Sequence, residues 1–259
     1  MRPDLIRELF EKETTYWWNV SKREMVISLV RDMVRNQQPG NRKIAVDIGC
    51  GTGFTALTLE SYYHTVGVDV SREALQFSKR RGLKSLCQIN QDCFPLPFKT
   101  GAFDLVLALD VIEHIEDDLR TLTECCRILK GGGSLIVTVP AFMMLWSPWD
   151  DALGHRRRYT VSMLAEKVQQ ADLTTRRITY MFFFIFPLAL LIRGTKKLIQ
   201  RDAASYSSDF IPLPKILNSF LILVGGLERW IITKLKLKLP LGLSVICVTT
   251  KGKPHRESF

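Results

Sequence analysis

Residues 43–59, with the sequence KIAVDIGCGTGFTALTL, constrain the fold more than any other stretch of this 259-residue chain. Residues 44–48 form a short, mostly apolar run, which is typical of a buried strand in a parallel sheet. Residues 54–59 fit the first turns of a helix, and three glycines lie between the two elements: Gly49, Gly51 and Gly53. A strand, a glycine-rich turn and a helix predict a ligand site of backbone N–H groups at the positive end of a helix dipole.

The glycine spacing alone fits two kinds of ligand. Residues 51–56 also satisfy the G-x-G-x-x-G/A pattern of dinucleotide-binding turns. Asp47, two residues before the first glycine, separates the two interpretations by its charge. A carboxylate repels a pyrophosphate but attracts an ammonium or a sulfonium group. The turn therefore favours a cationic nucleoside ligand.

The sequence of residues 46–53, VDIGCGTG, resembles the first motif of the class I S-adenosylmethionine-dependent methyltransferases, D-x-G-x-G-x-G after a strand. The resemblance implies S-adenosylmethionine as the cofactor and an enzyme that transfers its methyl group. It also implies a set of cofactor-binding residues at the ends of the strands: Asp47, Gly49, Cys50, Gly51, Gly53, Asp69, Val70, Asp92, Cys93, Leu109 and Asp110.

Two acids in that set have specific expected partners. Asp69 ends a predicted strand at residues 65–68, 22 residues after Asp47, where a carboxylate can accept hydrogen bonds from both ribose hydroxyls. Asp92 follows a predicted strand at residues 83–89 and matches the position that meets the adenine amino group in the resembled family. An ordinary loop aspartate is the alternative for Asp92.

The alternation of strands and helices predicts an α/β fold with a doubly wound parallel sheet. Further strands are expected at residues 103–109 and 135–139, with a helix from 117 to about 130 that ends at three glycines. The resemblance implies a seven-stranded Rossmann-like sheet of order 3-2-1-4-5-7-6, with the seventh strand antiparallel. The expected divisions are listed by range: a helical cap at 1–40, the cofactor-binding core at 41–181, an apolar and basic helical insertion at 182–241, and the last strand with the tail at 242–259.

The fourth predicted strand ends in D-V-I-E-H, residues 110–114. Enzymes that methylate nucleobase amino groups usually carry Asn/Asp-Pro-Pro-aromatic at this point, and that sequence is absent. The stretch instead resembles small-molecule methyltransferases of the same class. His114 is a candidate base, with a packing role as the alternative.

Residues 145–160, LWSPWDDALGHRRRYT, follow the fifth predicted strand and so lie on the same sheet edge as the glycine turn. Histidine can take a proton near neutral pH, and arginine forks suit phosphate or carboxylate groups. We therefore expect His155 as a catalytic base and a group of substrate-binding residues: Trp146, Arg157, Arg158 and Tyr159. The alternative is a solvated loop whose arginines pair with Asp150 and Asp151.

This loop resembles the W-S-x-H-D-x-x-x-G-H-x-R-R-Y-T loop of a methyltransferase subgroup associated with sugar and lipid-linked substrates. Trp149 stands where that loop has its first histidine. Any base role therefore falls to His155, and no metal site is expected.

Three adjacent aromatics, residues 16–18, precede a predicted helix that opens with a capping box at Ser21. They cannot all share one helix face, so at least one packs outside its own helix. Trp17 and Trp18 are expected to cover the ligand pocket and contact substrate. A hydrophobic plug on the sheet is the alternative.

The basic charge is concentrated in the last third of the chain. Residues 1–175 hold 22 basic and 22 acidic residues, whereas residues 176–259 hold 14 basic and 4 acidic residues. The same third contains apolar stretches at 181–192 and 216–232, each shorter than the roughly 20 apolar residues of a spanning helix. We expect helices that lie peripherally on an anionic membrane, with an apolar lid or a dimer interface as the alternatives.

The remaining features concern compartment and substrate. The six cysteines form no C-x-x-C pair and the N-terminus is too charged for a signal peptide, so a cytoplasmic protein is expected, on the cytoplasmic face if it meets membrane. The expected reaction is O-methylation of a small or lipid-linked acceptor. The alternatives are a non-catalytic binding module at a membrane surface and an RNA methyltransferase. Nucleic acid is not expected as a partner, since no RNA-binding module is recognisable.

Overall fold

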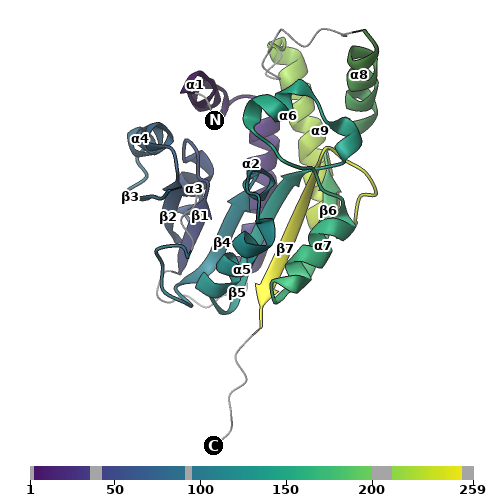
Figure 1. Ribbon diagram of the computed structural model, residues 1–259. Coiled ribbons are helices and arrows are strands. Elements are labelled where there is room, and N and C mark those ends of the chain that lie inside the picture. Colours follow the sequence, from purple (N-terminus) through teal and green to yellow (C-terminus); the bar gives the residue numbers. More distant parts are fainter. Residues whose placement is uncertain (1–2, 36–42, 91–94, 200–211, 253–259) are drawn as a thin grey trace, which may run out of the picture.

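A computed structural model describes residues 3–35, 43–90, 95–199 and 212–252. It contains a seven-stranded sheet of order β3-β2-β1-β4-β5-β7-β6 (Figure 1). The strands are β1 (Ile44–Ile48), β2 (His64–Asp69), β3 (Ser85–Gln88), β4 (Phe103–Leu109), β5 (Leu129–Pro140), β6 (Leu173–Met181) and β7 (Ser244–Lys251). Only β7 runs antiparallel to its neighbours, β5 and β6. The predicted fold class, strand order and antiparallel seventh strand are confirmed.

Helices cover both faces of this sheet (Figure 1). They are α1 (Pro3–Lys12), α2 (Trp17–Val34), α3 (Phe54–Leu59), α4 (Arg72–Arg81), α5 (Asp118–Ile128), α6 (Pro148–Leu153), α7 (Val161–Gln170), α8 (Phe186–Ile199) and α9 (Lys215–Thr233). Two short 3-10 turns, η1 (Ile112–His114) and η2 (Met143–Leu145), follow β4 and β5.

Alternate residues of the central strands supply two separate cores. Val106 of β4 and Val137 of β5 pack with residues of α5 and α7 on one face. Leu107 and Ile136, their neighbours in the chain, pack with α2 and α9 on the other. Side chains one residue apart point to opposite faces of a strand, so a central strand buried on both sides reads as a continuous apolar run.

The end of α5 differs from the predicted one. The helix stops at Ile128, and Lys130 with the three following glycines lies inside β5 rather than forming a helix cap. Lys130 forms an ion pair of 2.7 Å with Asp104. A Cβ on Gly133 would approach the carbonyl oxygen of Lys130 at 2.9 Å, so the close approach of backbone accounts for glycine at that position.

The start of α2 also differs. Ser21 does not cap the helix, because α2 already begins at Trp17 with Tyr16 at its N-cap. Ser21 is instead buried against α9, where Gly225 lies. The N-terminal lead and the insertion before β7, more than 180 residues apart in the sequence, therefore pack side by side on one face of the sheet.

Among the described residues of the insertion, one helix is long and apolar enough to cross a membrane by length and composition. This helix is α9, with 19 residues and a mean hydropathy of 1.4 in its most apolar window. The expectation that neither apolar stretch reaches spanning length is thus not met for α9. Its contact with α2 and its buried Glu228 also fit a helix resting on the sheet, so the composition alone is weak evidence for a span.

Candidate active site

The glycine turn between β1 and α3 lies against the ends of neighbouring strands. Gly49, Gly51 and Gly53 all have positive φ angles, at 69°, 55° and 79°. A Cβ on Gly49 would come within 2.6 Å of Val111, and a Cβ on Gly53 within 2.7 Å of the Ser78 Cβ. At Gly51 the nearest atom would be 3.9 Å away. The turn is therefore packed on its sides and has room at its middle glycine.

Three carboxylates converge on this turn. Asp47 is buried at the end of β1, and Asp69 accepts the Gly51 N–H at 2.8 Å. Glu13, from the segment before α2, accepts a hydrogen bond from the Thr52 hydroxyl within the turn. Burial, followed by the charges of Glu13 and Asp69, raises the pKa of Asp47 to about 8. Burial also raises the pKa of Glu13, against the hydrogen bond of Thr52 and the charge of Arg81.

Such crowded carboxylates fit a cationic ligand, because a positive group nearby favours their ionised form. The room above Gly51 and the carboxylates around it together suit the ammonium and sulfonium groups of S-adenosylmethionine. The residues predicted for that ligand on other strands lie at the same edge. Val70 is 48% exposed after β2, and Leu109 ends β4. Asp92 and Cys93 lie outside the described residues.

Asp110 directly follows β4 and has a left-handed conformation, with φ of 55°. Its carboxylate forms an ion pair with Lys22 of α2 and accepts the Thr138 hydroxyl at 3.1 Å. Burial opposes the charge, but Lys22 outweighs it and keeps the pKa of Asp110 below its ordinary value. A cation from the N-terminal lead thus reaches the crevice edge of β4.

Trp17 and Trp18, both predicted to cover the ligand pocket, have different surroundings in the structure. Trp17 is 8% exposed and belongs to the core between α2 and the sheet, as the plug interpretation anticipated. Trp18 is stacked on Phe182 at 4.0 Å between ring centroids, and the Lys22 ammonium lies 5.1 Å from its ring. Trp18 therefore lies beside the ion pair of Lys22 with Asp110.

His155 lies in a polar group at the same edge, beside His114. Its Nδ1 is 2.8 Å from the Asp150 carboxylate, and its ring lies 4.8 Å from that of His114. Burial alone would raise the pKa of Asp150, but its hydrogen bonds with His155 and Arg158 outweigh this effect and lower the pKa below its ordinary value. Since an ionised carboxylate only accepts, Nδ1 of His155 carries the proton and Nε2 is left as the reactive nitrogen.

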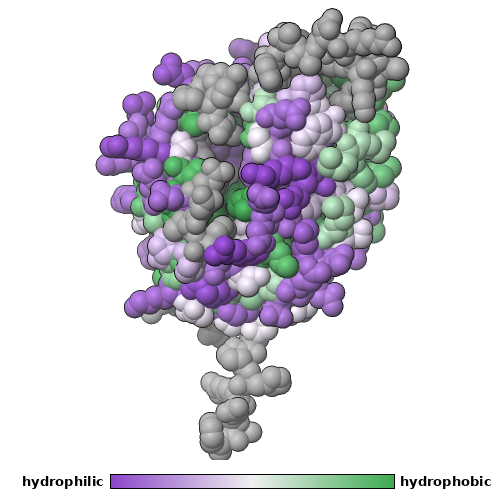
Figure 2. All heavy atoms as spheres, viewed as in Figure 1, coloured by the Kyte–Doolittle hydropathy of each residue, from purple (hydrophilic) through white to green (hydrophobic). Residues whose placement is uncertain are grey.

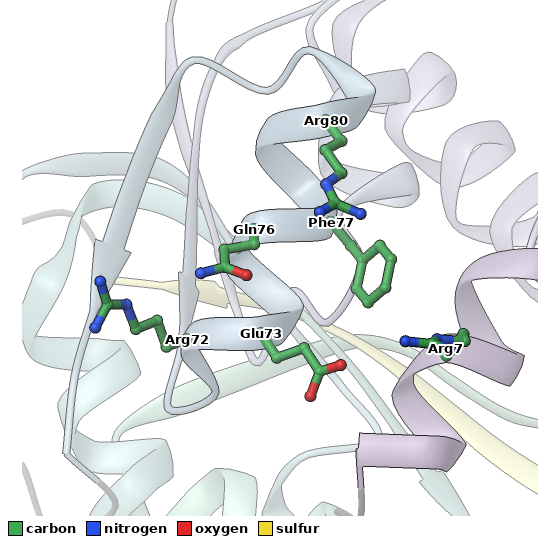
Figure 3. Close-up of a pocket in the computed structure, with 6 residues that line it drawn as sticks. All are labelled: Arg7, Arg72, Glu73, Gln76, Phe77 and Arg80. Carbon is green, nitrogen blue, oxygen red and sulfur yellow. The ribbon is translucent and has the colours of Figure 1, made fainter.

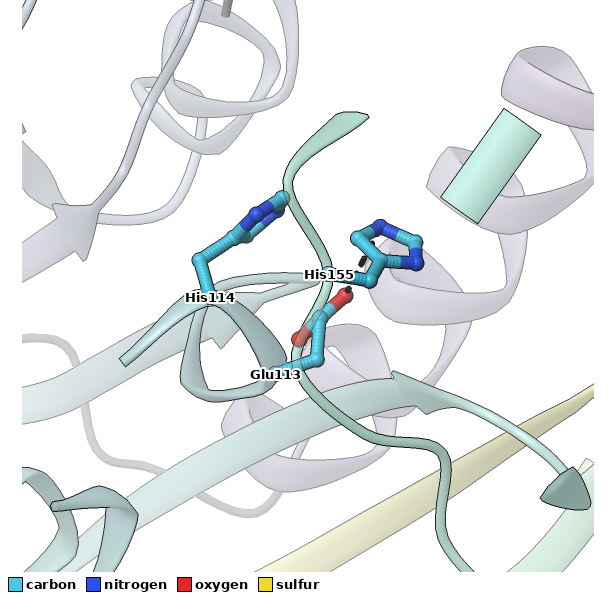
Figure 4. A group of neighbouring side chains, drawn as sticks. All are labelled: Glu113, His114 and His155. Carbon is cyan, nitrogen blue, oxygen red and sulfur yellow. Dashed lines mark ion pairs between the residues drawn. The ribbon is translucent and has the colours of Figure 1, made fainter. Parts of the chain in front are cut away.

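Glu113 and His114, the last residues of η1, complete this group (Figure 4). The Glu113 carboxylate is fully buried 4.0 Å from Nε2 of His155. Burial, and then the charge of Asp110, raises the pKa of Glu113 well above its ordinary value. Burial and the neighbouring His155 lower the pKa of His114 to about 4. His114 is therefore a neutral imidazole at neutral pH.

Two of the predicted substrate residues are instead structural. Arg158 is 5% exposed and forms two hydrogen bonds, of 2.8 and 2.9 Å, with Asp150. Tyr159 is fully buried and donates its hydroxyl to Asp118 at 2.7 Å. Neither side chain is open to a ligand, which corrects the prediction for both. The alternative is met in part: an arginine does pair with Asp150, but this pair is buried rather than solvated, and Asp151 accepts from Trp146 instead of from an arginine.

The other two predicted substrate residues remain near the surface. Arg157 donates to the Glu116 carbonyl and lies 3.2 Å from the Asp118 carboxylate. Trp146 donates its indole N–H to Asp151 at 3.2 Å. Both hold the loop that carries His155, and both keep partly exposed side chains.

Glu13, Glu113 and the orienting role of Asp150 were not predicted from the sequence. Glu13 lies in a segment without any recognisable pattern, so only the packing of α1 and α2 brings it to the glycine turn. Glu113 precedes the predicted candidate His114 and follows a buried strand, and this position was the signal that could have identified it. Asp150 lies in α6, five residues before His155, and the end of this helix with the loop after it brings the two side chains together.

A hollow lies between α1 and α4 (Figure 3). Its lining consists of six residues, three of them arginines: Arg7, Arg72, Glu73, Gln76, Phe77 and Arg80. The outer surface over α1 and α4 is mainly hydrophilic, while apolar residues gather on the side of α8 (Figure 2).

Comparison with known proteins agrees with the geometry of the glycine turn. Residues 46–137 match the family described as "Methyltransferase domain". The protein named "Probable tRNA methyltransferase 9B" from Mus musculus is 28% identical over 163 residues, which cover 58% of this chain and 35% of that protein. The "Ubiquinone biosynthesis O-methyltransferase" of Coxiella burnetii is 26% identical over 127 residues, covering 46% and 54% of the two chains. The chain thus spans about a third of the tRNA methyltransferase relative and about half of the other.

Solved structures share the fold across nearly the whole chain. A chain of the complex between the Haloferax volcanii Trm112 methyltransferase activator and a methyltransferase has a TM-score of 0.60 at 16% identity, covering 98% of this chain and 97% of that one. The Haemonchus contortus phosphoethanolamine N-methyltransferase 2 bound to S-adenosyl-L-methionine has a TM-score of 0.54 at 15% identity, with coverage of 96% and 60%.

The fold and the glycine turn are those of a Rossmann-like domain. Residues 46–137 are similar to the methyltransferase-domain family, and this similarity supports S-adenosylmethionine as the cofactor.

Proposed function

We propose that the protein transfers the methyl group of S-adenosylmethionine to an oxygen atom of a small or lipid-linked acceptor. The observation that carries this proposal is the pair of Asp150 and His155 at the carboxyl edge of the sheet. A hydroxyl is a poor nucleophile until it loses its proton, and Asp150 orients His155 so that Nε2 can take it.

The cofactor supplies an electrophilic methyl group on a sulfonium that leaves as a neutral thioether. The chain then has two tasks. The carboxylates around the glycine turn bind and orient the cation, and positioning of this kind contributes much of a displacement reaction's acceleration. His155 accepts the acceptor's proton as the new carbon–oxygen bond forms, while Asp150 stabilises the resulting imidazolium.

The test uses methyl-labelled S-adenosylmethionine with fractionated cell lipids, glycans and RNA. We expect label in a lipid or glycan fraction, and a loss of roughly 10²- to 10⁴-fold in turnover for His155→Ala. Cofactor binding by calorimetry should stay within about twofold, since His155 makes no contact with the glycine turn. His64→Ala, at an exposed histidine on β2, is the matched control. Full turnover in His155→Ala with the labelled acceptor would remove the base role.

We further propose that the acceptor side of the molecule rests on an anionic membrane at its cytoplasmic face. The helices α8 and α9 carry large exposed apolar side chains, among which Ile216 is 87% exposed and Leu223 is 71% exposed. Three exposed lysines follow α9: Lys234, Lys236 and Lys238. Apolar side chains beside lysines match the acyl boundary and the anionic headgroups of a lipid surface.

RNA is the second candidate acceptor, supported by the arginine-rich hollow between α1 and α4 and by the name of the tRNA methyltransferase relatives. Arginine forks suit the phosphates of a nucleic acid backbone. Label in the RNA fraction, lost on Arg7→Ala with Arg80→Ala, would favour it over a lipid-linked acceptor. Absence of label from every fraction despite cofactor binding would instead indicate a non-catalytic binding module.

A further inference from the structure

Glu113, His114 and His155 form a compact group of metal-ligating side chains at the edge of the crevice (Figure 4). Each offers one ligand atom, and these atoms lie within 4.8 Å of one another. Glu113 and His114 come from η1 after β4, whereas His155 follows α6, so the fold brings two segments 41 residues apart to one point.

Both histidines have their Nδ1 atom engaged. Nδ1 of His155 lies 2.8 Å from an Asp150 oxygen, and Nδ1 of His114 lies 3.3 Å from the Gly154 carbonyl oxygen. Carboxylate and carbonyl oxygens can only accept here, so each ring donates from Nδ1. Nε2 of each ring then keeps its lone pair. Histidines that bind metals are commonly oriented in this way, by an acceptor behind the ring.

The buried carboxylate of Glu113 points to a cation independently of the distances between the three side chains. Its side chain is fully buried, and neither carboxylate oxygen has a hydrogen-bond partner among the described residues. The nearest lysine and arginine are occupied elsewhere, since Lys22 pairs with Asp110 and Arg158 with Asp150. Nε2 of His155 lies 4.0 Å from Glu113, which is beyond hydrogen-bond distance. An unpaired buried carboxylate is costly, and buried charges are normally paired or bound to metal. A cation between Glu113 and the two imidazoles would satisfy both oxygens' need for a partner.

We propose that Glu113, His114 and His155 bind one divalent transition-metal ion, with Zn²⁺ as the ion that best suits them. Two imidazole nitrogens and one carboxylate are the protein ligands of one type of catalytic zinc site, which leaves a position for water or substrate. Ligand atoms around a tetrahedral zinc lie about 3.4 Å apart. Oε1 of Glu113 and Nε2 of His155, at 4.0 Å, need only a small side-chain rotation to reach that spacing.

The loop sequence argued against a metal because Trp149 replaces its first histidine. In the structure two of the three ligands come from η1, and the loop contributes His155 together with Asp150 behind it. Nε2 of His155 cannot hold the ion and accept a proton at once, so in the metal-bound protein the ion replaces this nitrogen as the group that activates the acceptor hydroxyl. An ion with an open position lowers the pKa of a hydroxyl bound to it, and the hydroxyl's proton then passes to solvent water. This catalytic role, unlike metal binding itself, rests on the proposed O-methylation.

The test measures metal binding directly on the full chain. Protein stripped with a chelator is titrated with Zn²⁺ by calorimetry, and with Co²⁺ while visible absorption is recorded. We expect one ion per chain and visible Co²⁺ absorption bands typical of a tetrahedral, four-coordinate site. Glu113→Gln and His114→Ala should each weaken Zn²⁺ binding at least tenfold. Glu116→Gln, at an 85% exposed glutamate, and His64→Ala should bind as the unaltered protein does.

The site would be refuted by binding well below one equivalent, or by unchanged affinity in both ligand variants. Glu113→Gln is nearly isosteric, and His114 is partly exposed, so at least one of the two variants should fold. Cofactor calorimetry on the same samples separates the two proposals. A protein that binds Zn²⁺ through these residues but labels no acceptor refutes the proposed reaction and keeps the site. A protein that labels an acceptor at full turnover and binds no Zn²⁺ refutes the metal site and keeps the proposed reaction.

Discussion

Asp47 connects the glycine turn to the charge of its ligand. The side chain is 2% exposed and lies near two other carboxylates, so the ionised form is disfavoured until a cation arrives. In the free protein the folded state retains a proton on Asp47 up to a pKa of about 8, whereas the unfolded chain loses it near the ordinary value of 3.8. The folded state therefore binds more protons in this window, and the contribution of Asp47 to the free energy of unfolding falls as pH rises through it.

The same linkage makes cofactor binding depend on pH. A cationic ligand favours ionised Asp47, so binding should release a proton below pH 8 and tighten by up to roughly tenfold per pH unit between pH 6.0 and 7.5. Calorimetry in two buffers of different ionisation enthalpy measures the released proton. Asp47→Asn should bind more weakly and lose most of the pH dependence. A dissociation constant for the unaltered protein that stays flat over this range would contradict the account.

Arg158 contributes to the stability of the fold. Its guanidinium is buried in two hydrogen bonds to Asp150, which also orients His155. Arg158→Met leaves Asp150 without its buried partner and should lower the free energy of unfolding by about 3–5 kcal/mol. Arg156→Met, at the neighbouring arginine whose side chain is 49% exposed, should change it by less than about 0.5 kcal/mol. Urea unfolding of both variants checks this, and equal effects would show that burial of the pair does not matter.

Between elements, the contact of α2 with α9 ties the N-terminal lead to the insertion before β7. Glu228 of α9 is buried and accepts the backbone N–H groups of Phe182 and Phe183, the latter at 2.7 Å. Arg229 pairs with Glu24 of α2 at 2.9 Å. These polar contacts fix one face of α9 on the protein and leave its apolar residues on the opposite side exposed.

Two adjacent glycines of α9 test the closeness of this contact. A Cβ on Gly225 would lie 2.8 Å from the Ser21 Cβ, while a Cβ on Gly226 would meet nothing within 4 Å. Gly226→Ala should raise the free energy of unfolding by about 0.5–1 kcal/mol, through helix propensity alone. Gly225→Ala should lower it by about 1–3 kcal/mol, because the two helices must separate. Stabilisation of both variants in chemical denaturation would mean that α2 and α9 do not pack as described.

At the scale of elements, periodicity and turn chemistry predicted most of the strands but not every boundary. The glycines after Lys130 resembled a helix cap, yet they extend β5, because pairing with β4 on one side and β7 on the other outweighs the local preference of glycine. Ser21 resembled an N-cap, yet it lies inside α2, since the aromatic residues before it gain more by packing into the core. Tertiary packing decided both cases, and local sequence does not contain it.

For the molecule as a whole, the excess of basic residues follows the exposed apolar helices. The protein carries a net charge of +10, and its last third holds the surplus. We expect the full chain to sediment with vesicles that contain anionic lipid and to be released by salt, since screening weakens attraction to the headgroups. Changing Lys234, Lys236 and Lys238 to glutamate should abolish sedimentation, whereas Lys79→Glu with Lys84→Glu should leave it largely intact. Equal binding to neutral vesicles would contradict the electrostatic part.

The position of the proposed cofactor residues at the sheet edge could be predicted from the sequence, whereas the burial of the loop residues proposed for the acceptor could be predicted only in part. Local pattern placed Asp47, Asp69 and Asp110 at strand ends, because the carboxyl edge of a parallel sheet follows from chain order. The burial of Arg158 and Tyr159 in the loop 145–160 depended on partners from α6 and α5, and the sequence does not show these contacts. Glu113 and Glu13 gained their roles through contacts between distant segments.

The central claim is that a glycine turn surrounded by carboxylates selects a positively charged methyl donor. Calorimetric titration of the full chain with S-adenosylmethionine and, separately, with NADH tests it most directly. The account predicts one S-adenosylmethionine bound per chain with micromolar or tighter affinity and no measurable heat from NADH. Tight binding of NADH, with none of the sulfonium compound, would contradict it.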